Sequence, residues 1–133
     1  MLLLDTDVMV DIRRGFRPAI QWLASLQETP AVSVITVLEL LHGCRNKQEQ
    51  QRVEQLIERI PVVHLDNSAS QLAVEYFRGF HLSHGIGVLD ALVAAIAVSR
   101  GFTLCTFNEK HYRAIPELIV LQPYVRSGQQ EAR

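Results

Sequence analysis

Two kinds of hydrophobic pattern alternate along the chain. Short apolar runs, typical of buried strands, occur at "MLLL", "AVSV", "PVVHL", "FTLCTF" and "LIVLQP". Between them, apolar residues recur every three or four positions, which predicts helices over about 5–14, 18–27, 35–43, 46–60, 68–80 and 89–100, and a short helix or turn over 108–115. This order predicts an α/β fold with three α/β/α layers around a central, mostly parallel sheet of four to five strands.

The ends of several elements carry recognisable signals. Ser68 and Gln71 have the spacing of a capping box, and Pro18 suits the first turn of a helix. The segment "HLSHGIGV" is predicted to be a loop, so the histidine pair within it is interpreted as surface residues rather than a zinc site. We expect one domain over 1–125 and a frayed tail over 126–133.

Composition narrows the class of protein. The chain has 133 residues, of which 48% are hydrophobic and 20% are charged, so a soluble globular domain is expected. A net charge of −1 argues against broad electrostatic binding to nucleic acid and leaves only local basic patches. The longest apolar run, "ALVAAIAV", is too short for a membrane span, and "MLLLD" lacks the basic start of a signal peptide. Cys44 and Cys105 form no disulfide or metal pattern, which favours a reduced, cytoplasmic protein.

Polar residues cluster where strands are predicted to end and helices to begin. In a parallel α/β sheet these positions meet at one edge, where ligands bind. Each residue could instead be a simple helix cap, since short polar side chains and a Thr-x-x-Glu pair serve that role. The positions are Asp5, Thr36, Glu39, Asp90, Thr106 and Asn108.

Asp90 is the hardest of these to explain as a cap. From Leu89 to Val98 it is the single polar residue, so the helix is expected to be buried on all sides. A buried, unpaired carboxylate costs several kcal/mol, and no lysine or arginine lies near it in sequence before Arg100. A hard divalent cation bound by several carboxylates, Mg²⁺ or Mn²⁺, would resolve this cost.

Three segments together resemble the PIN-domain ribonucleases, and among them the VapC-type toxins of toxin–antitoxin pairs. "LLLDTDVMVD" resembles the family's opening strand with its first aspartate, Asp5. "VSVITVLELLHG" resembles the second motif, with Glu39 and the trailing Gly43. "GVLDALVAAIAVSRGFTLCTFNEKHY" resembles the most characteristic segment, with Asp90 and the Thr-x-Asn turn of Thr106 and Asn108. The resemblance covers nearly the whole chain.

The resemblance implies a metal-dependent endoribonuclease, with catalytic Asp5, Glu39 and Asp90, that leaves a 5′-phosphate and a 3′-hydroxyl. Asp5 and Asp90 would bind Mg²⁺ or Mn²⁺ directly, and Glu39 would act through water or orient the nucleophile. His111 stands where many members have a fourth acidic residue, so one tightly held ion is expected, with a second recruited together with RNA. Supporting and RNA-contacting roles would fall to Thr6, Thr106, Asn108, Arg13, Arg14 and Lys110.

The same resemblance implies partners. A small antitoxin protein would cover the acidic pocket, and a homodimer is expected, with the amphipathic helices near 17–27 and 47–60 as docking surfaces.

Three alternative functions stay open at this point. A PIN-like scaffold could act only as a non-catalytic binding module. "LLLDTDV" also resembles the nucleophile motif of haloacid-dehalogenase phosphatases, in which Asp7 would be the acid/base, but the required downstream lysine and acidic pair are poorly matched. A response-regulator receiver would need Asp66 as its phosphoacceptor, which is a poor match.

Overall fold

The computed structural model describes residues 1–126 and contains a five-stranded sheet in which all neighbouring strands are parallel. The strand order is β3-β2-β1-β4-β5. Register pairs Leu3 with Ala31 on one side of β1 and with Leu104 on the other. This confirms the predicted fold class. The strands are β1 (Leu2–Leu4), β2 (Ala31–Ser33), β3 (Val62–Val63), β4 (Thr103–Cys105) and β5 (Val120–Leu121).

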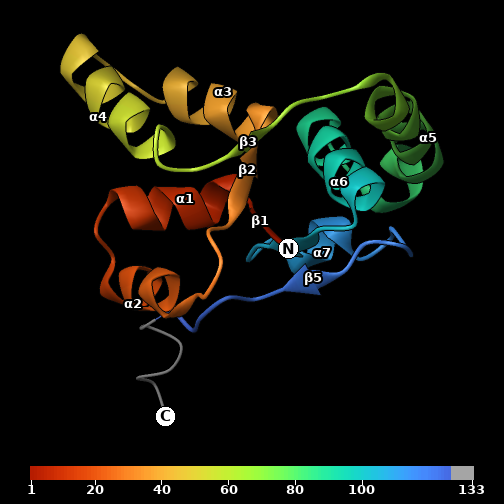
Figure 1. Ribbon diagram of the computed structural model, residues 1–133. Helices are drawn as coiled ribbons and strands as arrows, with labels where there is room; N and C mark the ends of the chain where they lie inside the picture. Colours follow the sequence, from red (N-terminus) through yellow and green to blue (C-terminus); the bar gives the residue numbers. More distant parts are fainter. Residues whose placement is uncertain (127–133) are drawn as a thin grey trace.

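Helices cover both faces of this sheet (Figure 1). In that view α1, α2 and α4 lie on the left and the α5–α6 pair lies on the right. The helices are α1 (Thr6–Arg13), α2 (Arg17–Ser25), α3 (Val34–His42), α4 (Lys47–Ile57), α5 (Asn67–His84), α6 (Val88–Arg100) and α7 (Glu109–Tyr112).

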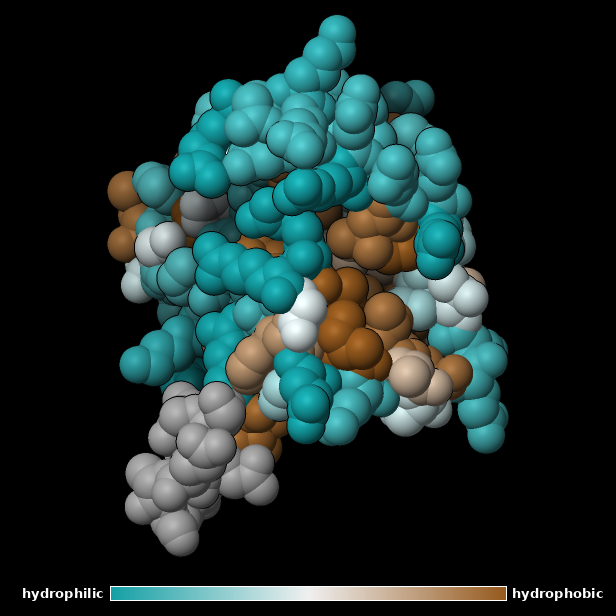
Figure 2. All heavy atoms as spheres, turned by 90° about the vertical axis from the view of Figure 1, so that its left-hand side faces the viewer, coloured by the Kyte–Doolittle hydropathy of each residue, from teal (hydrophilic) through white to brown (hydrophobic). Residues whose placement is uncertain are grey.

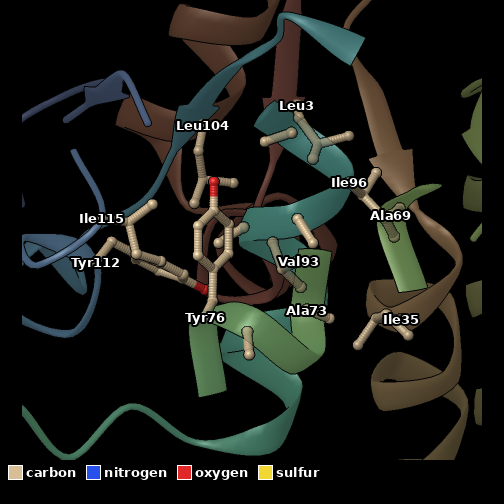
Figure 3. Close-up of a cluster of buried hydrophobic side chains, with 14 of the residues drawn as sticks. Leu3, Ile35, Ala69, Ala73, Tyr76, Val93, Ile96, Leu104, Tyr112 and Ile115 are labelled. Carbon is tan, nitrogen blue, oxygen red and sulfur yellow. The ribbon is translucent and has the colours of Figure 1, made fainter. Parts of the chain in front are cut away.

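The hydrophobic core consists of two clusters, one on each face of the sheet, because successive side chains of each strand point to opposite faces. In β1, Leu3 belongs to the cluster beneath α5 and α6, whereas Leu4 belongs to the cluster beneath α1, α2 and α4. Leu104 and Cys105 divide in the same way in β4. Successive side chains of a strand point to opposite faces, so runs without polar residues are what a sheet covered on both sides requires. Figure 3 shows the cluster on the α5–α6 side.

The prediction of a loop over "HLSHGIGV" was wrong for its first half. Helix α5 continues through His84 and ends at Gly85, whose φ of 70° is the left-handed conformation that stops a helix. His81 stacks on Phe77 one turn earlier at 4.3 Å between ring centroids, and its Nδ1 lies 2.8 Å from the Ile86 carbonyl oxygen. These contacts stabilise a last turn that propensity alone does not indicate.

The capping box predicted at Ser68 and Gln71 was misplaced, and the alternative role of Thr36 and Glu39 as a capping box is not observed. Helix α5 is capped two residues earlier than predicted, by Asp66, whose carboxylate accepts from the Ala69 N–H at 2.8 Å. Helix α3 is capped by Ser33, which accepts from the Thr36 N–H at 3.1 Å. Aspartate and serine at the end of an extended segment compete effectively for the cap position. Glu39 is therefore released from a capping role.

The remaining sequence predictions concern the C-terminal segment, membrane spans and the cysteines. Arg126, the last described residue, pairs with Asp11 and lies 4.1 Å from the centroid of the Phe107 ring. The rest of the expected tail, 127–133, lies outside the described residues. Within 1–126, no helix combines the length and apolar content that crossing a membrane requires. Both cysteines have free thiols.

Candidate active site

The candidate site lies at the carboxyl edge of the sheet, beside its central strand. Asp5 follows β1, and Thr106 follows the neighbouring strand β4. The chain runs from β1 outward to β2 and β3, and then returns to the other side of β1 as β4. This reversal of strand order is where parallel α/β sheets open a crevice for ligands.

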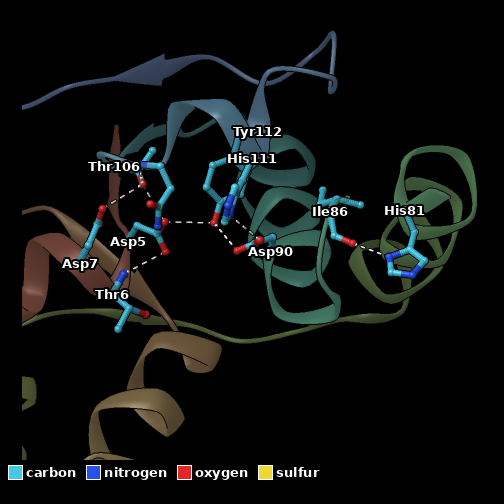
Figure 4. Close-up of polar contacts among 10 residues, drawn as sticks. Asp5, Thr6, Asp7, His81, Ile86, Asp90, Thr106, His111 and Tyr112 are labelled. Carbon is cyan, nitrogen blue, oxygen red and sulfur yellow. Dashed lines mark hydrogen bonds and ion pairs between the residues drawn. The ribbon is translucent and has the colours of Figure 1, made fainter. Parts of the chain in front are cut away.

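Asp5 is buried and is held by three donors (Figure 4). Its Oδ1 accepts from the Thr6 N–H at 2.9 Å, so Asp5 does cap α1, which was the alternative to a role in ligand binding. Its Oδ2 accepts from the Thr106 hydroxyl at 2.8 Å and from the Tyr112 hydroxyl at 3.0 Å. The cap uses only one of the two oxygens, so capping does not account for the whole environment of the side chain.

Burial and, to a smaller extent, the nearby Asp7 carboxylate together raise the pKa of Asp5 to about 6, although its three hydrogen bonds act to lower that pKa. Burial also raises the pKa of Asp7 above its usual range. Asp7 accepts from the Phe107 N–H at 2.8 Å and so ties the start of α1 to the turn after β4. The site thus concentrates negative charge that the protein alone does not fully compensate.

Asp90 is less buried than its apolar sequence neighbours suggested, and its side chain is 26% exposed. The first turn of α6 lies at the surface, with Val88 and Leu89 exposed, so the expectation of a helix buried on all sides was wrong there. Asp90 also has partners. Its Oδ1 lies 3.3 Å from the Tyr112 hydroxyl, and its Oδ2 lies 3.1 Å from Nδ1 of His111.

Glu39 is connected to this pair indirectly. Its Oε1 accepts a hydrogen bond from the Thr6 hydroxyl, which also lies 3.1 Å from the Thr36 hydroxyl. Among residues 1–126, no three His, Cys, Asp or Glu side chains are close enough together to enclose a metal ion by themselves. Of the three predicted acidic residues, Asp5 and Asp90 share a contact atom, the Tyr112 hydroxyl, whereas Glu39 does not contact it.

The donor chemistry nonetheless fits a hard divalent ion. Carboxylate oxygens are the protein ligands that Mg²⁺ and Mn²⁺ prefer, and Mg²⁺ keeps several waters when one or two carboxylates hold it. The exposed part of Asp90 leaves such waters access from solvent.

Of the other predicted site residues, Asn108 and Lys110 lie close to the carboxylates, whereas Arg13 and Arg14 lie farther away. Asn108 is exposed, and within the described chain its side chain makes no hydrogen bond, although its N–H donates to the Thr106 hydroxyl at 3.0 Å. Lys110 lines a hollow of about 290 Å³ beside His111. Arg13 and Arg14 lie at the far end of α1, roughly 12 Å from Asp5 at 1.5 Å per residue.

Sequence reasoning missed Tyr112 and underestimated His111 and Asp7. Tyr112 is 1% exposed and contacts both Asp5 and Asp90. An aromatic residue in a four-residue helix is normally assigned to the core, so its hydroxyl gave no signal. Asp7 was assigned a chemical role only as the acid/base of the phosphatase alternative, and its bond to Phe107 depends on a segment 100 residues later.

Comparisons with known proteins agree with this geometry. A family model described as PIN domain matches residues 2–116. Ribonuclease VapC10 of Mycobacterium tuberculosis is 31% identical over 121 residues, which cover 89% of this chain and 90% of that protein. A toxin–antitoxin complex from Klebsiella pneumoniae has a TM-score of 0.79 at 25% identity, with 95% of this chain and 100% of that chain covered. VapBC2 from Rickettsia felis, bound to a promoter DNA fragment, has a TM-score of 0.76 at 26% identity, with 90% and 96% covered.

The family model spans most of the sequence, and the curated relative matches it nearly end to end. The all-parallel sheet agrees with the fold of the solved structures that match this chain. The protein therefore belongs to the PIN domain family and, within it, to the VapC-type ribonucleases.

Proposed function

We propose that this protein is a metal-dependent endoribonuclease and the toxin of a toxin–antitoxin pair. The observation that carries the proposal is the approach of Asp5 and Asp90 to one hydroxyl, at 3.0 and 3.3 Å, at the edge of the sheet where ligands bind. These residues, 85 positions apart in sequence, are joined there by a neutral hydroxyl group. The ribonuclease name of the relative at 31% identity supports the assignment of RNA as substrate.

Asp5 and Asp90 would hold one Mg²⁺ or Mn²⁺ ion, with water completing the coordination. When bound, the ion would polarise the scissile phosphate and lower the pKa of a bound water. Thr6 and Thr106 keep Asp5 in place through the two hydrogen bonds to its separate oxygens. Glu39, which accepts a hydrogen bond from the Thr6 hydroxyl, would orient a water rather than bind the ion directly.

RNA would approach from the α7 side of the site. Lys110 and Arg113 line the hollow beside His111 and Asn108, so their charges lie where a phosphate backbone would pass. Arg13 and Arg14, at the far end of α1, would contact only a more distant part of the substrate.

The antitoxin is proposed to bind the face formed by α1, α2 and α4. Figure 2 shows apolar surface at the centre of this face, bordered by hydrophilic side chains. Ile20 of α2 is 41% exposed, and a hollow beside α4 is lined by Ile12, Arg13, Glu49, Arg52 and Leu56. Several solved relatives are toxin–antitoxin complexes, which supports a small protein as the occupant.

We propose that a second copy of the chain covers the surface of α3, α5 and α6. The sequence had instead favoured the helices near 17–27 and 47–60 as docking surfaces. Leu38 of α3, Val74 of α5, and Val88 and Leu89 of α6 are all between 47% and 59% exposed. We expect light scattering of the purified chain to give a dimer and Val88→Glu to shift it toward monomer. The matched control is Ile119→Glu, also at an exposed apolar position. A monomeric wild type would contradict the proposal.

The central experiment is cleavage of RNA by the chain purified free of antitoxin. We expect a panel of structured RNAs to be cut in the presence of Mn²⁺ or Mg²⁺, with products that carry 5′-phosphates. EDTA should abolish cleavage, and excess Mn²⁺ should restore it, because carboxylates alone cannot stabilise charge on a phosphate. Cleavage that persists in EDTA would contradict metal dependence. Mn²⁺ binding without cleavage of any RNA would favour the non-catalytic binding module.

The phosphatase and receiver alternatives find little support in the geometry. Asp7 is engaged by the Phe107 N–H, and both lysines of the chain, Lys47 and Lys110, are exposed. Asp66 follows β3, an edge strand, rather than a central one.

A further inference from the structure

Tyr112 presents one hydroxyl group to two carboxylates. Its oxygen lies 3.0 Å from Oδ2 of Asp5 and 3.3 Å from Oδ1 of Asp90 (Figure 4). A phenol has a single proton to donate, so the two carboxylates share one donor. The hydroxyl therefore sets the distance between the two side chains that the proposed function treats as metal ligands.

The ring that carries this hydroxyl is firmly anchored. Tyr112 is 1% exposed and belongs to the core cluster with Leu104, Val93 and Ile115 (Figure 3). A close-packed core holds aromatic side chains in one rotamer. Packing of the ring against residues of β4 and α6 therefore restrains the position of the hydroxyl.

The two carboxylates depend on Tyr112 to different degrees. Asp5 has two other donors, the Thr6 N–H and the Thr106 hydroxyl. Among the described residues, Asp90 has one other partner, His111, whose side chain is 56% exposed. An exposed partner restrains a side chain weakly because water competes for the same bond.

We propose that Tyr112 is a positioning residue, which fixes Asp90 relative to Asp5 so that both carboxylates meet one divalent ion. This inference rests on the proposed function, since it requires that Asp5 and Asp90 bind metal. It assigns to α7 a role beyond closing the core: the helix carries the group that aligns ligands from β1 and α6.

Tyr112→Phe tests the proposal because it removes only the oxygen and keeps the ring in the core. Tyr76→Phe is the matched control: Tyr76 is 5% exposed, and its hydroxyl donates to Glu117 at 3.0 Å, with no contact to Asp5 or Asp90. Calorimetric titration with Mn²⁺ should give a Kd about tenfold weaker for Tyr112→Phe, the size of loss typical when a residue that orients a metal ligand is removed. Tyr76→Phe should stay within about twofold of wild type. Thermal melts without metal report whether either variant has lost its fold.

A second readout separates positioning from a general structural role. With RNA, Tyr112→Phe should lower kcat with little change in KM, and saturating Mn²⁺ should recover part of the loss. Equal Mn²⁺ affinity in wild type and Tyr112→Phe, with binding lost in Asp90→Asn, would overturn the role of Tyr112 and leave the metal site intact. Failure of the wild type to bind Mn²⁺ would overturn the metal site and this inference together.

Discussion

Asp90→Asn is expected to lower the rate of RNA cleavage by a factor on the order of 10²–10³, the range seen when one charge-stabilising group is removed from a hydrolytic site. The amide keeps the size and hydrogen-bonding capacity of the side chain but carries no charge to hold a divalent ion. Because the Asp90 side chain is 26% exposed and sits in the first turn of α6, the fold should tolerate the change. The measurement is the single-turnover cleavage rate at saturating Mn²⁺.

Two further aspartate variants serve as controls for that experiment. Asp66→Asn makes the same chemical change at an exposed helix cap, where asparagine caps equally well, and should leave cleavage unchanged. Asp7→Asn should retain most of the activity, since Asp7 holds the turn at Phe107 and is not a proposed ligand. Loss of activity in Asp7→Asn with activity spared in Asp90→Asn would refute the assignment and favour the phosphatase interpretation.

Asp5→Asn should inactivate the enzyme while stabilising the metal-free fold at neutral pH. In the folded chain the pKa of Asp5 is about 6, above its ordinary value of 3.8, because the buried carboxylate resists ionisation. The folded state therefore holds this proton more tightly than the unfolded state, and the stability it contributes is present below about pH 4 and lost as pH rises toward 6. The shift corresponds to about 3 kcal/mol of unfolding free energy.

Urea unfolding in EDTA at several pH values between 4 and 7.5 measures this effect. The difference in unfolding free energy, Asp5→Asn minus wild type, should increase between pH 4 and 6 and then level off. Asparagine can still cap α1 through the Thr6 N–H, and the Thr106 and Tyr112 hydroxyls can rotate to accept from its amide. A difference that does not vary with pH would show that Asp5 is not destabilised by its charge.

The sequence predicted the fold well because the fold depends on patterns that are local. Five apolar runs separated by helical periodicity indicate a parallel sheet, and a parallel sheet brings its carboxyl ends to one edge. The approach of Asp5 and Thr106, 101 residues apart, follows from that topology without any knowledge of side-chain detail.

Features set by side-chain packing could not be predicted in this way. The exposure of Val88 and Leu89 depends on how α6 is rotated against α5, and an apolar sequence does not reveal it. For the same reason Asp90 was assigned too deep a burial, and its contacts with Tyr112 and His111 were missed. The site residues stay predictions that the variants above can test.

Strand order also has a consequence for when the site can exist. Central strand β1 is synthesised about a hundred residues before its partner β4 and before Tyr112, which joins Asp5 to Asp90. A growing chain emerges from the ribosome amino end first, and early segments fold as they appear. A nascent chain therefore exposes Asp5 long before Thr106 and Tyr112 are available to align it. The acidic edge can therefore assemble only after β4 and α7 have been synthesised, later than every element from β1 to α6.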